Sequence, residues 1–130
     1  MIAGIGVDIV DINRIRKAME KNHNFVLKIL NNIENTKPYT KNKYEFIAAR
    51  FAAKEAVAKA LGTGFVGFSF KDIIIKNNSS GMPYIILEGQ AKKLAEKYGY
   101  YKIHLSISHE RDYAIAYVIW EVDKIENNII

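Results

Sequence analysis

The chain has 130 residues, of which 49% are hydrophobic and 25% are charged, a composition typical of one globular domain with a real core. The absence of cysteine excludes disulfides, cysteine-ligated zinc and thiol catalysis. The net charge is +5, and neither a signal peptide nor a membrane-spanning apolar run is apparent. We therefore expect a single cytoplasmic domain over residues 1–130 that does not interact with membranes.

The positive charge is concentrated in residues 37–59, which hold six basic side chains against two acidic ones. A local basic cluster favours a phosphate-bearing ligand or an acidic partner, although it is also typical of an ordinary solvated surface. One alternative function is therefore a basic module that binds nucleic acid or a nucleotide without catalysis. No nucleic-acid-binding motif supports that alternative.

The apolar residues 2–10 predict a β-strand in which Asp8 is the only charge. Because side chains alternate between the two faces of a strand, Gly4, Gly6 and Asp8 share one face. The glycines allow close backbone approach, and we expect open space in front of the carboxylate. Asp8 is then a ligand-binding residue or, more simply, a strand-end or capping aspartate.

Two helices are predicted next. Asp11 caps the first, which runs from Ile12 to about Lys21 and has a basic outer side, and the second runs from Phe25 to about Asn32.

The stretch 50–64, RFAAKEAVAKALGTG, predicts a long helix that begins near residues 41–44 and stops at the glycines after Leu61. It is apolar almost all round, which is typical of a buried helix. Arg50 and Lys54 nevertheless lie within its apolar arc, and Glu55 and Lys59 share one narrow stripe. Charges on a buried helix need a partner, a metal or a ligand. The alternative explanation of Glu55 is a surface ion pair with Lys59, one helical turn away.

The second half of the chain changes to short strands. We predict a hairpin from 72–76 and 84–87, a small helix over 89–98, and two further strands over 104–108 and 113–121. The expected fold class is α+β, with an antiparallel sheet packed around one long buried helix. His109 lies at the mouth of the last hairpin, where it can contact phosphate or be a hydrogen-bonded loop histidine.

Asp8 and Glu55 are both carboxylates in apolar surroundings. Two such groups that meet can share a hard cation such as Mg²⁺, whose remaining ligands are water and substrate phosphates. The segment 29–40 contains one acidic residue, Glu34, for which the sequence suggests no role.

Four segments together resemble the holo-acyl-carrier-protein synthases, which are bacterial 4′-phosphopantetheinyl transferases. They are GIGVDIV at 4–10, RFAAKEAVAKALGTG at 50–64, GMPY at 81–84, and SISHE followed by YAIAYVI near the end. The resemblance covers almost the whole chain. It implies Mg²⁺-dependent transfer of 4′-phosphopantetheine from coenzyme A to a serine of apo-acyl carrier protein, with release of adenosine 3′,5′-bisphosphate, in fatty acid biosynthesis.

The resemblance also implies a homotrimer with active sites at subunit interfaces. It makes Asp8 and Glu55 the metal ligands and, with His109, the catalytic residues, while Arg14 faces the acidic carrier protein. The serine proton goes to Glu55 or to a water held by the metal. Expected coenzyme A contacts are Lys41, Lys43, Arg50, Lys54, Lys59, Gly62, Thr63, Gly64, Pro83, Ser108 and His109.

Overall fold

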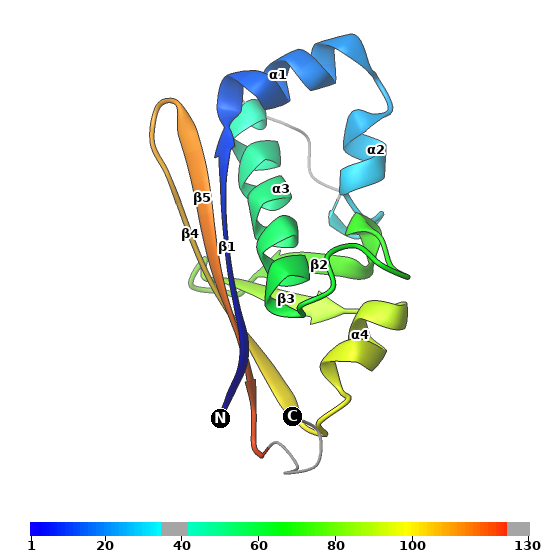
Figure 1. Cartoon of the computed structure of the whole chain (residues 1–130). Coiled ribbons are helices and arrows are strands. Elements are labelled where there is room, and N and C mark those ends of the chain that lie inside the picture. The colour runs from blue at the N-terminus through cyan, green and yellow to red at the C-terminus, as the bar shows by residue number, and fades with distance from the viewer. Residues whose placement is uncertain (35–41, 125–130) are drawn as a thin grey trace.

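The structure is a computed structural model that describes residues 1–34 and 42–124 (Figure 1). Its main sheet is antiparallel with strand order β1-β5-β4, formed by β1 (Ile2–Asp11), β4 (Tyr101–His109) and β5 (Tyr113–Val122). The strands β2 (Ile73–Asn77) and β3 (Pro83–Leu87) form a separate antiparallel hairpin. The long helix α3 (Lys43–Ala60) packs on the main sheet, chiefly against β1 and β5. The predicted α+β class is confirmed.

The smaller helices surround α3. Helices α1 (Ile12–Lys21) and α2 (Phe25–Ile29) pack against it, while the short η2 (Phe70–Asp72) contacts α2, α3 and α4 (Gly89–Ala95). The predicted bounds of α1 are confirmed, whereas α2 and α4 both end earlier than expected. Within the described ranges 1–34 and 42–124, no helix has the length and apolarity needed to cross a membrane.

The helix α3 is buried on nearly all sides, as its composition predicts. Most of its buried positions are alanines, whose small side chains let neighbouring elements approach closely. The helix is capped at Leu61, and Gly62 follows with φ +84°, a left-handed conformation that glycine adopts without strain. The predicted glycine stop is therefore confirmed.

The strand β1 and the helix α3 touch backbone to backbone. A Cβ atom added at Gly4 would lie 1.9 Å from the Ala60 carbonyl oxygen, and one added at Gly6 would lie 2.0 Å from that of Ala56. The close backbone approach predicted at the two glycines is therefore confirmed, because α3 lies directly against them. Asp8 follows on the same face and is brought beside the helix.

The opposite face of the main sheet carries exposed apolar side chains. They come from the two strands β1 and β5, which are neighbours in the sheet: Ile5, Val7, Ile9, Tyr113, Ile115 and Tyr117. We call this set the outer sheet face.

Candidate active site

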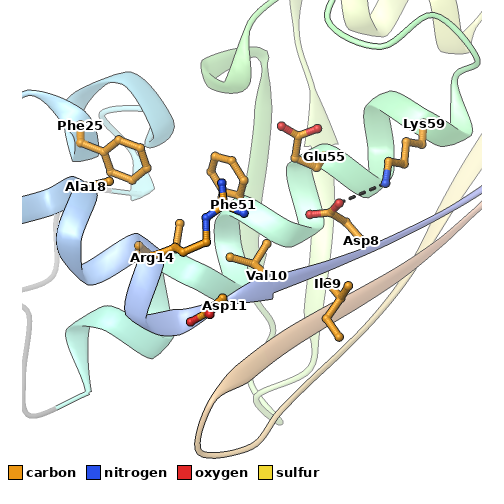
Figure 2. A pocket seen from close by; sticks show the side chains of 11 residues that line it. Asp8, Ile9, Val10, Asp11, Arg14, Ala18, Phe25, Phe51, Glu55 and Lys59 are labelled. Carbon is orange, nitrogen blue, oxygen red and sulfur yellow. Dashed lines mark hydrogen bonds and ion pairs between the residues drawn. The ribbon is translucent and has the colours of Figure 1, made fainter.

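Three carboxylates and two basic side chains line an open pocket of about 450 Å³, which we call the carboxylate pocket (Figure 2). β1 contributes Asp8, α1 contributes Arg14, and one side of α3 contributes Phe51, Glu55 and Lys59. Helical spacing explains the last set, since residues four apart lie on the same face of a helix. Residues that are far apart in the chain thus line one cavity.

Inside this pocket Lys59 binds the strand. Its ammonium donates to the Asp8 carboxylate (Nζ to Oδ1, 3.1 Å) and to the Val7 carbonyl oxygen (3.0 Å). In the part of the chain that the structure describes, this ion pair replaces the surface pair with Glu55 that the sequence allowed. Burial raises the pKa of Glu55, the negative charge of Asp8 raises it further, and Lys59 opposes both effects.

The donor set of the carboxylate pocket fits Mg²⁺. Over residues 1–34 and 42–124 there is no group of three or more histidine, cysteine or acidic side chains arranged to hold a metal ion. Mg²⁺, however, is usually bound through one or two carboxylates and completes its shell with water and substrate phosphates. Asp8 and Glu55 supply such a pair, whereas Asp11 is engaged in capping α1 through the backbone N–H of Asn13.

A second pocket of about 400 Å³, the histidine pocket, is lined by His109, Arg50, Asn77 and Pro83 among others. The Arg50 guanidinium donates to the Asn77 side-chain oxygen (2.9 Å) and lies 4.4 Å from the centre of the Phe46 ring. Burial lowers the pKa of Arg50, and Glu34 opposes this effect. Arg50 Nε is the one buried side-chain polar atom of the described residues that lacks a hydrogen-bond partner.

The carboxylate and histidine pockets have no lining residue in common. They use different sides of α3, since Glu55 lines the first and Arg50 the second. A single chain therefore does not bring Asp8 and Glu55 together with His109.

The structure corrects the prediction that Lys54 contacts coenzyme A. Lys54 is fully buried, and its ammonium donates to the Glu34 carboxylate (2.6 Å) and to the carbonyl oxygens of Ile29 (2.6 Å) and Phe70 (3.1 Å). All three N–H groups of the ammonium have partners within the protein. The positive charge of Lys54 within the apolar arc of α3 is therefore neutralised by Glu34 rather than by a ligand.

Among the described residues, the remaining predicted coenzyme A contacts are absent from the lining of both pockets. Gly62, Thr63 and Gly64 form the turn after α3, where the Thr63 hydroxyl donates to the Gly64 carbonyl oxygen (2.9 Å). Lys43 is exposed in the first turn of α3, and Ser108 is exposed on β4. Lys41 lies outside the described residues.

Sequence reasoning missed three contributors to these sites. Glu34 is the first: it is the only acidic residue in 29–40, and no local pattern indicates its pairing with Lys54. Phe25 lines the carboxylate pocket and stacks on Phe51 with ring centres 6.2 Å apart. Asn77 was assigned only to a turn, since nothing local indicates that it meets Arg50.

Comparison with known proteins agrees with this architecture. The family model described as the 4′-phosphopantetheinyl transferase superfamily matches residues 4–118. A holo-[acyl-carrier-protein] synthase of Clostridium kluyveri is 57% identical, with the alignment covering 98% of this chain and 96% of that protein. The crystal structure of the synthase from Neisseria meningitidis has a TM-score of 0.88 at 38% identity, covering 94% of this chain and all of the other.

The synthase from Bacillus anthracis, solved in complex with CoA (3′,5′-ADP), has a TM-score of 0.76 at 39% identity and covers 92% of this chain and 96% of its own. The chain therefore belongs to the holo-acyl-carrier-protein synthases of the 4′-phosphopantetheinyl transferase superfamily. This membership makes the alternative of a non-catalytic nucleic-acid module unnecessary.

Proposed function

We propose that this protein, acting as one catalytic domain, transfers the 4′-phosphopantetheine moiety of coenzyme A to a serine hydroxyl of apo-acyl carrier protein. Family membership supports the transfer, and one observation supports the site: Asp8 and Glu55 line a single pocket with the basic side chains of Arg14 and Lys59. Such a pocket combines ligands for a cation with positive charge for phosphates and for an acidic protein.

In this proposal Asp8 and Glu55 hold Mg²⁺, which neutralises negative charge that develops on the pyrophosphate as it is cleaved. The serine oxygen forms a bond to the β-phosphorus, and the bond from that phosphorus to the bridging oxygen breaks, releasing adenosine 3′,5′-bisphosphate. Glu55, or a water beside it, accepts the serine proton. Arg14, exposed on α1, orients the acidic carrier protein at the mouth of the pocket.

We further propose that the active form is a homotrimer in which the carboxylate pocket of one subunit faces the histidine pocket of its neighbour. Two features support it. The outer sheet face leaves apolar side chains exposed in the single chain, and His109 lies in a pocket separate from Asp8. In an assembled site, His109 and Arg50 contact the phosphates of a coenzyme A whose pyrophosphate lies beside Asp8.

Mass spectrometry of an apo-acyl carrier protein tests the reaction. With coenzyme A and Mg²⁺ the carrier gains the mass of phosphopantetheine, and a chelator abolishes the gain. Asp8→Asn and Glu55→Gln each lower kcat at least about 100-fold while the circular dichroism spectrum stays unchanged. Full activity in both variants contradicts the metal assignment, and no mass gain with any of several carriers contradicts the function.

Subunit mixing tests the shared site. Asp8→Ala and His109→Ala proteins, each inactive alone, are unfolded, mixed in equal amounts and refolded together. If each site combines Asp8 of one subunit with His109 of another, about a quarter of the sites in random trimers are intact. Activity that stays at the level of the separate variants argues for sites within one subunit.

A further inference from the structure

Lys59 is the cationic side chain that contacts the Asp8 carboxylate in the carboxylate pocket. Its ammonium is held 3.1 Å from Asp8 Oδ1 and 3.0 Å from the Val7 carbonyl oxygen, both in β1. The two partners differ in exposure, because the Lys59 side chain is 53% exposed while that of Asp8 is 17% exposed. Asp8 is therefore largely buried in the pocket wall, whereas the lysine reaches it from the solvent side.

We propose that Lys59 is a positioning residue that serves as an exchangeable counter-ion, neutralising Asp8 until a phosphate of coenzyme A draws its ammonium away and a divalent cation takes its place. The inference rests on the proposed function, in which Asp8 and Glu55 are the metal ligands. It predicts an order of binding, coenzyme A before the metal, which the assignment of the metal ligands does not predict. The metal binds weakly to the free protein and tightly once the diphosphate is present.

The physical basis is competition between like charges. An ammonium and a divalent cation that both contact one carboxylate lie within a few ångströms of each other, where they repel strongly in a partly desolvated pocket. Lysine carries a compact charge on a stem of four methylene groups, so it can leave Asp8 without any change in the backbone. Phosphate offers the ammonium an alternative partner in the same pocket.

Because binding linkage is reciprocal, this exchange couples the two ligands. Coenzyme A increases metal affinity partly by moving Lys59, and the metal increases coenzyme A affinity by the same factor. A diphosphate that also ligates the metal directly contributes coupling of its own. The contribution of Lys59 to the coupling between the metal and coenzyme A is the contribution that is lost when the ammonium is removed by substitution.

The experiment measures metal affinity of the full chain by calorimetry with Mg²⁺ and by electron paramagnetic resonance with Mn²⁺, with and without coenzyme A. No carrier protein is present, so no turnover occurs. Lys59→Met is expected to bind either metal about tenfold more tightly than the wild type when coenzyme A is absent. The increase in metal affinity caused by coenzyme A is expected to be correspondingly smaller in the variant.

Two matched variants separate contact from net charge. Lys59→Arg keeps a cation that can reach Asp8 and should behave like the wild type. Lys92→Met removes the same charge from the exposed side of α4, outside both pockets, and should leave metal affinity unchanged within about twofold.

Each outcome is decisive. Equal metal affinity of the wild type and Lys59→Met without coenzyme A overturns the counter-ion role while leaving the metal site intact. An equal gain in Lys92→Met overturns it as well, since the effect is then one of net charge. Absence of metal binding in every protein, even with coenzyme A, overturns the proposed metal site itself.

Discussion

Two lysines of α3 show how neighbouring positions on one helix acquire different roles. Lys54 is buried among backbone carbonyls and pairs with Glu34, whereas Lys59 is half-exposed and pairs with Asp8. Burial lowers the pKa of Lys54, and its ion pair with Glu34 opposes that effect. The first lysine is part of the core, and the second is available to ligands.

The Lys54→Met variant tests the structural role of the buried pair. Removing one partner leaves Glu34 buried without a counter-ion, so we expect a loss of about 3–5 kcal/mol in the free energy of unfolding, measured with urea. The double variant Glu34→Gln, Lys54→Met should recover part of this loss. Lys43→Met, which changes an exposed residue of the same helix, should stay within about 0.5 kcal/mol of the wild type.

If Lys54 were instead a contact for coenzyme A, the Lys54→Met variant would unfold like the wild type and lose only coenzyme A affinity.

The sequence indicates which side chains of the site are reactive better than it indicates their contact partners. Asp8 and Glu55 stand out because each is an acid in an apolar segment. The partner of Lys54 depends on the path of the chain between α2 and α3, which no local pattern specifies. The separation of His109 from Asp8 depends in the same way on tertiary arrangement.

At the scale of elements, the contact between β1 and α3 determines where Asp8 lies. The Gly6→Ala variant would place a methyl group 2.0 Å from the Ala56 carbonyl oxygen, so strand and helix must separate. We expect a loss of at least about 2–3 kcal/mol in the free energy of unfolding, measured by chemical denaturation, together with weakened metal binding.

Gly99→Ala is the control for this prediction. Gly99 has φ +91°, and an added Cβ meets nothing within 4 Å, so its substitution should cost only about 1–2 kcal/mol from the backbone conformation. Similar losses in the two variants would contradict the role assigned to close packing at Gly6.

The pairing of β4 with β5 carries an exposed ion pair that responds to pH. A hydrogen bond with His104 (2.7 Å) holds the pKa of the Glu121 carboxyl below its ordinary value of 4.5. The pKa is lower in the folded chain, so the stabilisation is present above pH 4.5 and is lost as the pH falls through the folded-state pKa. Carboxyl NMR should show the Glu121 midpoint rising in His104→Ala; an unchanged midpoint would assign the shift to other charges.

Most elements can be predicted from the sequence because their patterns are local. The alanine-rich run and the glycines after Leu61 each specify structure within a few residues. The ends of α2 and α4 are less predictable, because short helices depend on tertiary contacts for most of their stability. The glycines at 4 and 6 predict a close backbone approach, but a glycine pattern does not indicate which element approaches.

At the scale of the whole molecule, the outer sheet face and the two separate pockets have one explanation in an assembled trimer. Nothing in a single sequence specifies which pocket of one copy meets which pocket of another, so this arrangement rests on the resemblance and on the exposed side chains. Ile115 is opposite Ile9 of β1 and Ser108 of β4, in the middle strand of the sheet near the turn that joins β4 to β5.

The Ile115→Lys variant is expected to remain folded, because the side chain is exposed in the single chain, but to sediment as a monomer. Its activity should fall at least about tenfold, since each site would lack the neighbouring His109. Tyr100→Lys, at an exposed residue outside the outer sheet face, should keep the size of the wild type. A fully active Ile115→Lys monomer would contradict the shared site.

The backbone contact at Gly4 and Gly6 has a practical consequence for engineering. No rotatable side chain separates the strand from the helix there, so the spacing between the carboxylates of Asp8 and Glu55 does not depend on rotamers in the rest of the interior. Libraries that seek higher melting temperatures can therefore vary the buried isoleucines of β2, provided that the volume of the core is kept. They should hold the two glycines and the alanines opposite them constant.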